Sequence, residues 1–219
     1  MDRHVERFHA VPDGDLMLCP GNGVAYQRDM SQRVSYDKDY FDKYVGYEGT
    51  PIARRIVSAR VAMVRRHYPG ALLDVGVGSG EFLRACGTGS VGFDINPVAV
   101  AMLQASGRYQ DRFDAVEALT FWDTLEHVED PDFYFSRIRR GAYVFVSLPI
   151  FSDLRKVRES KHYRPGEHFY YWTARGFVDW MARHGFRLIE QNREETEAGR
   201  EAIESFAFVK DLWRMAEAA

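Results

Sequence analysis

The chain has 219 residues, 46% hydrophobic and 14% aromatic, which is enough for one sizeable core and too few for a second full domain. Its two cysteines, Cys19 and Cys86, form no CxxC pair, so the sequence supports neither a disulfide framework nor a cysteine zinc site and predicts a reducing, cytoplasmic setting. A formal net charge of −3 argues against a dedicated nucleic-acid-binding protein, whose surface usually carries a basic excess.

Residues 1–49 are irregular and rich in aromatic side chains, so we interpret them as a lead-in or lid segment before a domain at residues 50–219. The first residues contain no apolar run typical of a secretory signal, and the longest apolar stretch, residues 142–151, is about half of a membrane span. We therefore expect a protein that is neither exported nor embedded in a membrane.

Helices and strands are predicted to alternate from residue 50 onward. Capping residues at Thr50 and Asn96, each followed by a proline, mark the start of two helices. Short apolar runs mark the strands. In chain order we predict a helix over 51–68, a strand over 71–75, a short helix, a strand over 91–95, a helix over 97–107 and a strand over 118–123.

The second half of the domain continues this alternation. Asp130 and Pro131 start a helix that should close in the basic residues 137–140, where the helix dipole favours cations. Strands alternating with helices predict an α/β fold with a mostly parallel sheet. The last two strands have no helix between them and should pair as an antiparallel β-hairpin. These later elements are a strand over 142–148, a helix over 173–185 and strands over 185–191 and 203–210.

The stretch LLDVGVGSGEF, residues 72–82, carries a ligand-binding pattern. Gly76, Gly78 and Gly80 follow a predicted strand that contains Asp74. Glycines at the carboxyl end of such a strand let the backbone approach a nucleotide-like ligand closely, although an ordinary tight turn is the alternative. Asp94 ends the next strand, where a carboxylate can accept hydrogen bonds from both ribose hydroxyl groups.

Charge distinguishes between the possible ligands. A pyrophosphate is best held by N–H groups at a helix start with no acid nearby. Here Asp74, Glu81, Asp94 and Asp123 should place several carboxylates around one crevice, and Glu81 follows Gly80 where the pattern departs from GxGxxG. A cationic ligand without phosphate, such as S-adenosylmethionine, therefore suits the crevice better than NAD does.

The sequence contains DVGVGSGEF, GFDINPVAV, LTFWDTLEHVEDP and RRGAYVFVSLP in this order. These segments resemble the class I S-adenosylmethionine-dependent methyltransferases, and most closely the small-molecule enzymes of the ubiquinone-biosynthesis type (methyltransferase types 11 and 23). The resemblance covers roughly residues 70–210. It implies a Rossmann-like, mostly parallel seven-stranded sheet with a C-terminal antiparallel hairpin, helices on both faces, and S-adenosyl-L-methionine as cofactor.

The resemblance also implies roles for individual residues. The segment Asp74–Gly80, with Gly76 and Gly78, would surround the methionine part of the cofactor. Asp94, with its neighbour Ile95, would hold the ribose, and Asp123 would lie beside the transferred methyl group. Enzymes of this kind usually place an acid against the adenine amino group after the third strand. That region is short here, and Asp114 is favoured over Asp111.

Histidines are the first candidates for a base, because they titrate near neutrality and methyl transfer needs a base only if the acceptor must lose a proton. Among His127, His162 and His168 we predict His168 as the base. It follows the turn at Pro165 and Gly166, and the enzymes that this chain resembles often carry a histidine there. His127 is the second candidate and is expected to brace the loop beneath the cofactor. A purely structural role is the alternative for both.

A metal site on the same loop is a further alternative. Asp123, Glu126 and His127 offer oxygen and nitrogen atoms that a divalent metal could use. A motif of one turn without a distant partner is weak, so no metal is predicted.

The acceptor is expected under residues 152–173, which follow the fifth strand and are basic. We predict that Arg155, Lys161 and Arg164 recognise an anionic group and that Tyr170 stacks on a planar substrate. A solvated charged loop is the alternative. The predicted function is therefore methyl transfer to an oxygen or nitrogen of a small molecule, which can be anionic.

Three other functions remain as alternatives. A nucleic-acid or nucleotide methyltransferase should show a basic face or a base-flipping motif, and the sequence has neither. A non-catalytic module, such as one that only binds S-adenosylmethionine, is a further alternative, and the intact glycines and Asp94 argue against a module that has merely kept the fold. An NAD-dependent dehydrogenase would need room for a catalytic domain. The sequence predicts a small-molecule partner and no membrane partner, and it leaves the oligomeric state open.

Overall fold

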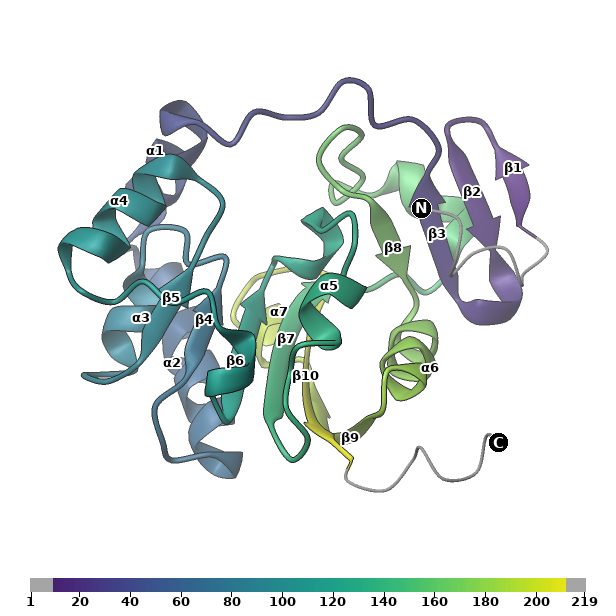
Figure 1. The fold of residues 1–219 in the computed structure, drawn as a ribbon. Coiled ribbons are helices and arrows are strands. Elements are labelled where there is room, and N and C mark those ends of the chain that lie inside the picture. The colour runs from purple at the N-terminus through teal and green to yellow at the C-terminus, as the bar shows by residue number, and fades with distance from the viewer. Residues whose placement is uncertain (1–9, 212–219) are drawn as a thin grey trace.

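The computed structural model describes residues 10–211, which form two sheets flanked by helices (Figure 1). The predicted lead-in (1–49) and domain (50–219) extend beyond this range, so their parts at residues 1–9 and 212–219 lie outside the description. The larger sheet has the strand order β5-β4-β6-β7-β10-β9 and the smaller one β1-β2-β3-β8. No helix among the described residues is long and apolar enough to cross a membrane.

The larger sheet consists of short strands with mostly buried side chains. β5, β4, β6 and β7 run parallel, and β10 runs antiparallel to both β7 and β9. The predicted mostly parallel sheet with a C-terminal antiparallel hairpin is therefore confirmed. The strands are Leu73–Val75 (β4), Val91–Phe93 (β5), Ala118–Trp122 (β6), Tyr143–Pro149 (β7), Phe186–Asn192 (β9) and Ile203–Lys210 (β10).

The sheet differs from the expected seven strands at its β5 edge. Beyond β5, the described chain forms only an isolated parallel bridge between Gly92 and Tyr109. The connection from α4 (Pro97–Ala105) to β6 is short, and a 3-10 turn, Phe113–Ala115, takes up part of it. Too few residues remain for a full strand, so a single bridge marks the seventh position.

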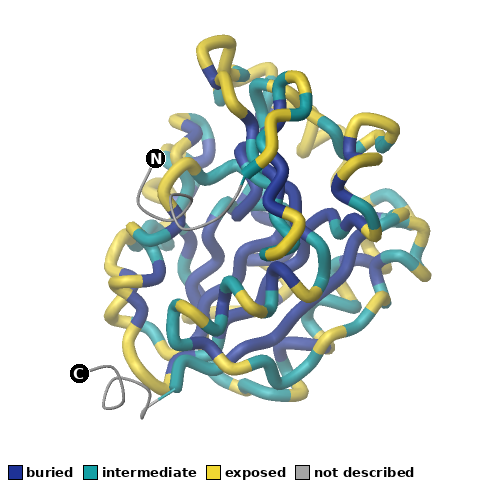
Figure 2. Tube along the Cα trace, turned by 90° about the vertical axis from the view of Figure 1, so that its right-hand side faces the viewer, coloured by how far each residue is buried: buried dark blue, intermediate teal, exposed yellow. Residues whose placement is uncertain are grey.

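Helices cover both faces of the larger sheet, as predicted. Successive side chains of a strand point to opposite faces, so the apolar strands present two apolar faces that helices bury. In β7, Val144 and Val146 belong to the core on one face, and Phe145 belongs to the core on the other. Figure 2 shows the resulting band of buried strands, with exposed residues concentrated in the peripheral loops. Side chains of α5 (Asp132–Phe135) and α6 (Ala174–Arg183) join the first core, and those of α2 (Pro51–His67) and α3 (Glu81–Ala85) join the second.

Side-chain caps confirm three predicted helix starts. Thr50, Asn96 and Thr173 accept hydrogen bonds from backbone N–H groups two or three residues later, at 3.2, 2.9 and 3.0 Å. These contacts satisfy N–H groups that have no partner within the first turn of a helix. Local sequence alone therefore determines where α2, α4 and α6 begin.

The helix expected to close in residues 137–140 is shorter than predicted, because α5 ends at Phe135. The Lys210 ammonium group donates to the backbone carbonyls of Phe135 at 2.6 Å and Ile138 at 2.8 Å. These carbonyls are thus satisfied by a distant side chain and not by further helical turns. A short helix, α7 (Glu194–Glu197), also lies between β9 and β10, where none was expected.

The smaller sheet overturns the expectation that the first 49 residues are irregular. Three short strands from this segment pair antiparallel, and Val24 lies opposite Trp172 of β8. Their partner is more than 140 residues away in the sequence, so local periodicity could not reveal the sheet. Residues 28–37 then cross to α1 (Lys38–Tyr47), which lies beside α4 (Figure 1). The strands are Val11–Asp13 (β1), Leu16–Cys19 (β2), Val24–Gln27 (β3) and Tyr170–Trp172 (β8).

Candidate active site

The glycine-rich loop connects β4 to α3 at the carboxyl edge of the larger sheet. Gly76, Gly78 and Gly80 all adopt positive φ values, of 80°, 53° and 79°, a region that side chains rarely tolerate. A Cβ atom at Gly76 would lie 2.5 Å from the hydroxyl oxygen of Thr124 on the loop after β6. Glycine is therefore required there for two reasons, the backbone conformation and the close approach of the neighbouring loop.

Asp94 directly follows β5, and its side chain forms a hydrogen bond with the glycine-rich loop. Its carboxylate accepts hydrogen bonds from the backbone N–H of Asn96 at 2.8 Å and, more weakly, of Gly78 at 3.4 Å. Burial raises its pKa above the ordinary aspartate value. The side chain lines the cavity in front of the glycine loop. The structure therefore places the Asp94 carboxylate at this cavity, and its contact with a ribose stays a prediction.

Two adjoining cavities are lined by residues of the glycine loop, and a third adjoins the first of them. The central cavity, of about 110 Å³, lies between the loop, Asp94 and the tyrosines of α1. The loop-side cavity, of about 540 Å³, shares Gly76, Gly78 and Asp123 with it. The outer cavity, of about 420 Å³, shares Ile95 and several other lining residues with the central cavity. The central cavity thus shares lining residues with both of the others.

Two tyrosines of α1, and a third that lies two residues before the helix, line the central cavity. Tyr36, Tyr40 and Tyr44 are spaced four residues apart, and successive ring centroids lie 4.9 and 5.4 Å apart. The Tyr40 hydroxyl donates to Glu167 at 3.0 Å, which ties this helix to the loop before β8. The sequence analysis did not single these residues out, although their spacing of four places them on one side of a helix.

Asp74 lies beneath the glycine loop and is buried. The Thr120 hydroxyl on β6 donates to its carboxylate at 2.6 Å. Burial raises the pKa of Asp74 to about 7. The residue lines the loop-side cavity together with Gly76 and Gly78. A neighbouring cationic ligand would stabilise the ionised form of this carboxyl group.

Asp123, at the end of β6, lines both the central and the loop-side cavity. Its carboxylate accepts hydrogen bonds from Arg60 at 2.7 Å and from Arg200 at 2.7 and 2.9 Å. Although burial opposes ionisation, Arg200 and Arg60 hold the pKa of Asp123 well below its usual range. Asp123 thus borders two of the cavities, but its charge is already balanced by two guanidinium groups.

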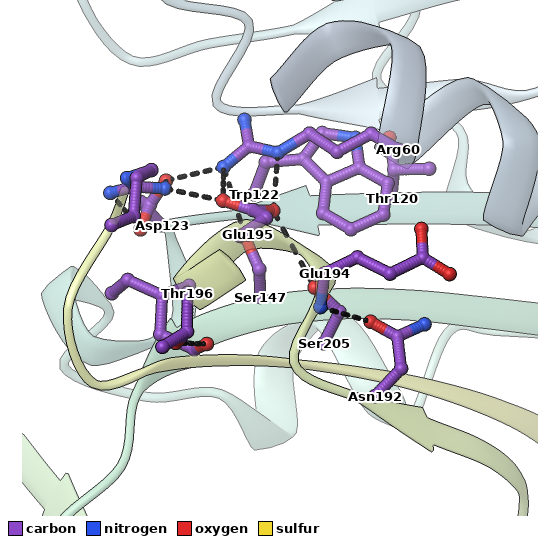
Figure 3. Close-up of polar contacts among 12 residues, drawn as sticks. Arg60, Thr120, Trp122, Asp123, Ser147, Asn192, Glu194, Glu195, Thr196 and Ser205 are labelled. Atoms are coloured by element: carbon purple, nitrogen blue, oxygen red, sulfur yellow. Dashed lines mark hydrogen bonds and ion pairs between the residues drawn. The ribbon is translucent and has the colours of Figure 1, made fainter. Parts of the chain in front are cut away.

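The same arginines bind a second buried acid, which the sequence analysis missed. Arg60 donates to Glu195 of α7 at 2.7 Å, and Arg200 donates to Glu195 at 2.7 Å (Figure 3). The Glu195 side chain is 1% exposed. The network joins α2, α7 and the loop before β10 to the end of β6. No local pattern could have shown it, because its members come from four separate segments.

The two candidate histidines differ in their access to the cavities. His127 lines the central and outer cavities, and its Nδ1 lies 3.3 Å from the Tyr36 hydroxyl. His168 is 3% exposed and lines none of the three cavities formed by the described residues. Burial lowers the pKa of His168 to about 2. The expectation that His168 overlooks the pocket mouth is therefore wrong, whereas the expectation that His127 braces the loop beneath the cofactor stays a prediction.

Backbone pairing explains the position of His168. The Phe169 N–H donates to the carbonyl of Glu126 at 2.7 Å, and this contact draws His168 against the 3-10 turn Leu125–His127. The ring centroids of His127 and His168 lie 4.6 Å apart. His162, the third candidate, lies 2.7 Å from the carbonyl of Glu201 through Nε2 and lines none of these cavities.

Asp114 is not placed to contact an adenine. Its side chain is 58% exposed and pairs with Arg112 at 3.2 Å, and neither it nor Asp111 lines any of the three described cavities. The buried residue of this turn is Phe113, whose ring packs edge-on against Phe93 at 5.2 Å. The local sequence shows that Asp114 lies after the third predicted strand position, but it does not show that the neighbouring Phe113 points into the core in its place.

Three of the four predicted acceptor-binding residues lie away from the cavities. Arg155 pairs with Asp153 at 2.8 Å, and Lys161 pairs with Glu201 at 3.1 Å. The Tyr170 hydroxyl donates to the carbonyl of Glu129 at 3.0 Å. Acids and carbonyl groups within the fold thus satisfy them. Only Arg164 lines a cavity, the loop-side one, and it pairs with Glu167 at 3.1 Å.

The residues present fit S-adenosylmethionine. A Cβ atom at Gly76 would collide with Thr124, and one at Gly78 would contact the ring of Tyr44 at 3.5 Å, so glycines keep the space beside this loop open. Asp94 offers a carboxylate for the ribose, and both charged residues that line the central cavity, Asp94 and Asp123, are acidic. The central cavity contains no lysine or arginine for a pyrophosphate among the described residues that line it.

Comparison with known proteins also indicates a methyltransferase. A family model described as a methyltransferase domain matches residues 38–191, which is more than half of the chain and begins at the first residue of α1. No curated protein sequence matches the chain significantly.

Many solved structures share the fold. A methyltransferase of Thermotoga maritima, described as a possible histamine N-methyltransferase, is 15% identical with a TM-score of 0.57, over 79% of this chain and 99% of its own. The magnesium protoporphyrin IX methyltransferase of Synechocystis, with S-adenosylhomocysteine bound, is 14% identical with a TM-score of 0.55, over 80% and 96%.

A third example is the 1,6-didemethyltoxoflavin N1-methyltransferase of Burkholderia thailandensis. It is 12% identical with a TM-score of 0.54, over 92% of this chain and 98% of its own, and contains its substrate and S-adenosylhomocysteine. At these identities the likeness concerns the fold, whereas the family model covers the sequence itself. The chain therefore belongs to the class I S-adenosylmethionine-dependent methyltransferases and is an enzyme whose methyl donor is S-adenosyl-L-methionine.

Proposed function

We propose that the enzyme transfers the methyl group to an oxygen or nitrogen atom of a small molecule. The observation that carries this proposal is the aromatic lining of the central cavity, where Tyr36, Tyr40 and Tyr44 lie beside the glycine loop. A polymer would need a groove with a basic surface. A cavity with a largely aromatic lining suits a small acceptor.

The donor supplies an electrophilic methyl group on a sulfonium. Asp94 and the glycine loop fix one end of the donor, and the tyrosines exclude water from the reacting atoms. Positioning of this kind can supply much of the rate of an in-line displacement. We assign the contact with the acceptor to His127 and not to His168, because only His127 lines the cavities among these two residues.

The acceptor need not be anionic. Of the predicted basic residues only Arg164 reaches a cavity, and Glu167 already pairs with it. The names of the structural neighbours above refer to small nitrogen compounds or a porphyrin, which agrees with a small-molecule acceptor. We further propose a cytoplasmic location, because Cys19 and Cys86 are both free thiols.

We also propose that residues up to 49 form a cover on the methyltransferase domain that begins at Thr50. α1 supplies Tyr40 and Tyr44 to the central cavity. The Asn96 side chain donates to the carbonyl of Asp37 at 2.9 Å, which holds the start of this helix on the domain.

Two measurements test the proposal. Thermal-shift titration should show a higher melting temperature with S-adenosylhomocysteine and no change with NAD, since a ligand that binds only the folded state stabilises it. Incubation with S-adenosylmethionine and a small-molecule extract should yield, by mass spectrometry, a product heavier by one CH₂ unit. Methylation of added RNA or DNA, with no small-molecule product, would instead support the nucleic-acid alternative.

A further inference from the structure

Three potential metal ligands converge beside the active site. The ligand atoms of Glu126, His127 and His168 all lie within 4.8 Å of one another. Glu126 and His127 belong to the 3-10 turn after β6, and His168 comes from the loop before β8. The sequence showed Glu126 and His127 without a distant partner, and the fold supplies that partner.

Two of these residues carry a buried side-chain atom without a hydrogen bond. Among the described residues, neither Oε2 of Glu126 nor Nδ1 of His168 has a partner, and the two residues are 2% and 3% exposed. An unsatisfied buried polar atom costs about 1–3 kcal/mol, and more when it carries charge. Buried polar groups in proteins nearly always have a partner, so two unsatisfied atoms on residues of one cluster point to a bound species.

We propose that Glu126, His127 and His168 bind one divalent transition-metal ion. Two imidazoles and one carboxylate form a donor set that suits zinc, cobalt, manganese or iron(II) better than magnesium or calcium, which prefer oxygen ligands. Zn–N and Zn–O bonds are about 2.0–2.2 Å long, so ligand atoms in a tetrahedral site lie roughly 3.3–3.6 Å apart. Binding therefore needs these side chains to draw together by about 1 Å, which rotation about side-chain bonds can supply.

Asp123 is not part of the proposed site, although it precedes Glu126 by three residues. Both of its oxygens accept hydrogen bonds from Arg60 or Arg200. A carboxylate held by two guanidinium groups has little tendency to bind a further cation. Because the arginines occupy Asp123, Glu126 is the acidic ligand of the proposed site. The described residues then supply three ligands to the ion.

The position of His127 shows what the ion can reach. His127 lines the central and outer cavities, whereas Glu126 and His168 lie behind it. Three protein ligands leave coordination positions open, which is typical of metal sites that bind a substrate. If the proposed function holds, an open position facing the cavities selects acceptors that carry an oxygen donor next to the methylated atom. Metal binding itself does not rest on that function.

The site is tested by metal binding to the full, tag-free chain after treatment with a chelator. Co²⁺ should bind with a stoichiometry of one per chain and give visible d–d absorption, and Zn²⁺ should displace it. The variants Glu126→Gln and His168→Asn should bind Co²⁺ at least about tenfold more weakly. The matched control is His162→Gln, a histidine in the same loop as His168 but outside the cluster, and it should bind like wild type.

A folding readout keeps the test decisive if His168→Asn is unstable. Glu126→Gln has nearly the same shape and removes a buried carboxyl group, so the metal-free variant should melt at or above the wild-type temperature. Zn²⁺ should raise the melting temperature of wild type but not of this variant. Absence of Co²⁺ binding, or equal binding by wild type and Glu126→Gln, overturns the proposal. Neither readout uses methyl donor or acceptor, so the outcome is independent of the methyl-transfer test.

Discussion

The Arg60 guanidinium group on α2 donates to the carboxylate of Asp123 at 2.7 Å, and this contact joins a helix on one face of the sheet to the loop that lines the active site. The Arg60 side chain is 12% exposed and also lies over the ring of Trp122, 5.0 Å from its centroid. With Glu195 and Arg200 it forms a buried network of two acids and two bases (Figure 3). The network shapes the floor of the site from residues that no local pattern connects.

Replacing Arg60→Met should lower the free energy of unfolding by about 3–5 kcal/mol, because the substitution leaves buried carboxylates without one of their partners. Urea denaturation measures this loss. The matched control is Arg66→Met on the same helix. Arg66 pairs with Glu190 and Glu194, but its side chain is 41% exposed, so its loss should cost about 1 kcal/mol or less. Equal losses for the two variants would show that the buried network contributes no more than a surface ion pair.

Asp94→Ala should weaken binding of S-adenosylhomocysteine by roughly 1.5–3 kcal/mol, which is typical for the loss of hydrogen bonds to a charged group. Isothermal titration calorimetry measures the affinity, and circular dichroism checks the fold. Asp114→Ala serves as the control because Asp114 is exposed and lines none of the described cavities, so its affinity should match wild type. Unchanged affinity in Asp94→Ala would remove this residue from the cofactor site.

Gly76→Ala should impair cofactor binding and stability more than Gly87→Ala. Both glycines have positive φ values, of 80° and 87°, so both substitutions strain the backbone, at a cost of about 1–3 kcal/mol. A Cβ atom at Gly76 would in addition lie 2.5 Å from the Thr124 hydroxyl oxygen, whereas nothing lies within 4 Å of one at Gly87. Thermal melts with and without S-adenosylhomocysteine compare the variants. The clash is unimportant if the two lose stability equally and both retain full cofactor affinity.

Asp74→Asn should make the cofactor-free protein more stable than wild type above neutral pH. Burial raises the pKa of Asp74 from an ordinary 3.8 to about 7 in the folded protein. Because the folded-state pKa is the higher one, the unfolded chain releases this proton first. Asp74 therefore opposes folding increasingly as the pH rises from about 4 to about 7, and the penalty stays constant above that.

Asparagine removes the titration and keeps a carbonyl oxygen for the Thr120 hydroxyl, which donates to Asp74 at 2.6 Å. The stability difference between variant and wild type should grow with pH, up to the order of 4 kcal/mol, since one pKa unit corresponds to about 1.4 kcal/mol. Melting curves at about pH 4 and pH 8 measure it. A difference that does not change with pH would mean that Asp74 titrates normally in the folded chain.

The sequence by itself determined the order of most helices and strands after residue 50, the helix starts at Thr50 and Asn96, and the nature of the cofactor. These features depend on residues that are near each other in the chain. A cap bonds to an N–H two or three residues away, and the pattern from Asp74 to Gly80 lies in one loop. Interactions between residues this close in the chain can be predicted from the sequence without the tertiary structure.

The tertiary structure alone decided which side chains face the cavities. His127 replaced His168 at the cavity wall, Asp114 turned out to be exposed, and the basic residues Arg155 and Lys161 were paired away from the site. Each outcome depends on a partner far along the chain, and a single backbone contact, from Phe169 to Glu126, is enough to place His168 behind His127. A sequence shows which groups are available, but burial and pairing are set by long-range packing, which no local pattern contains.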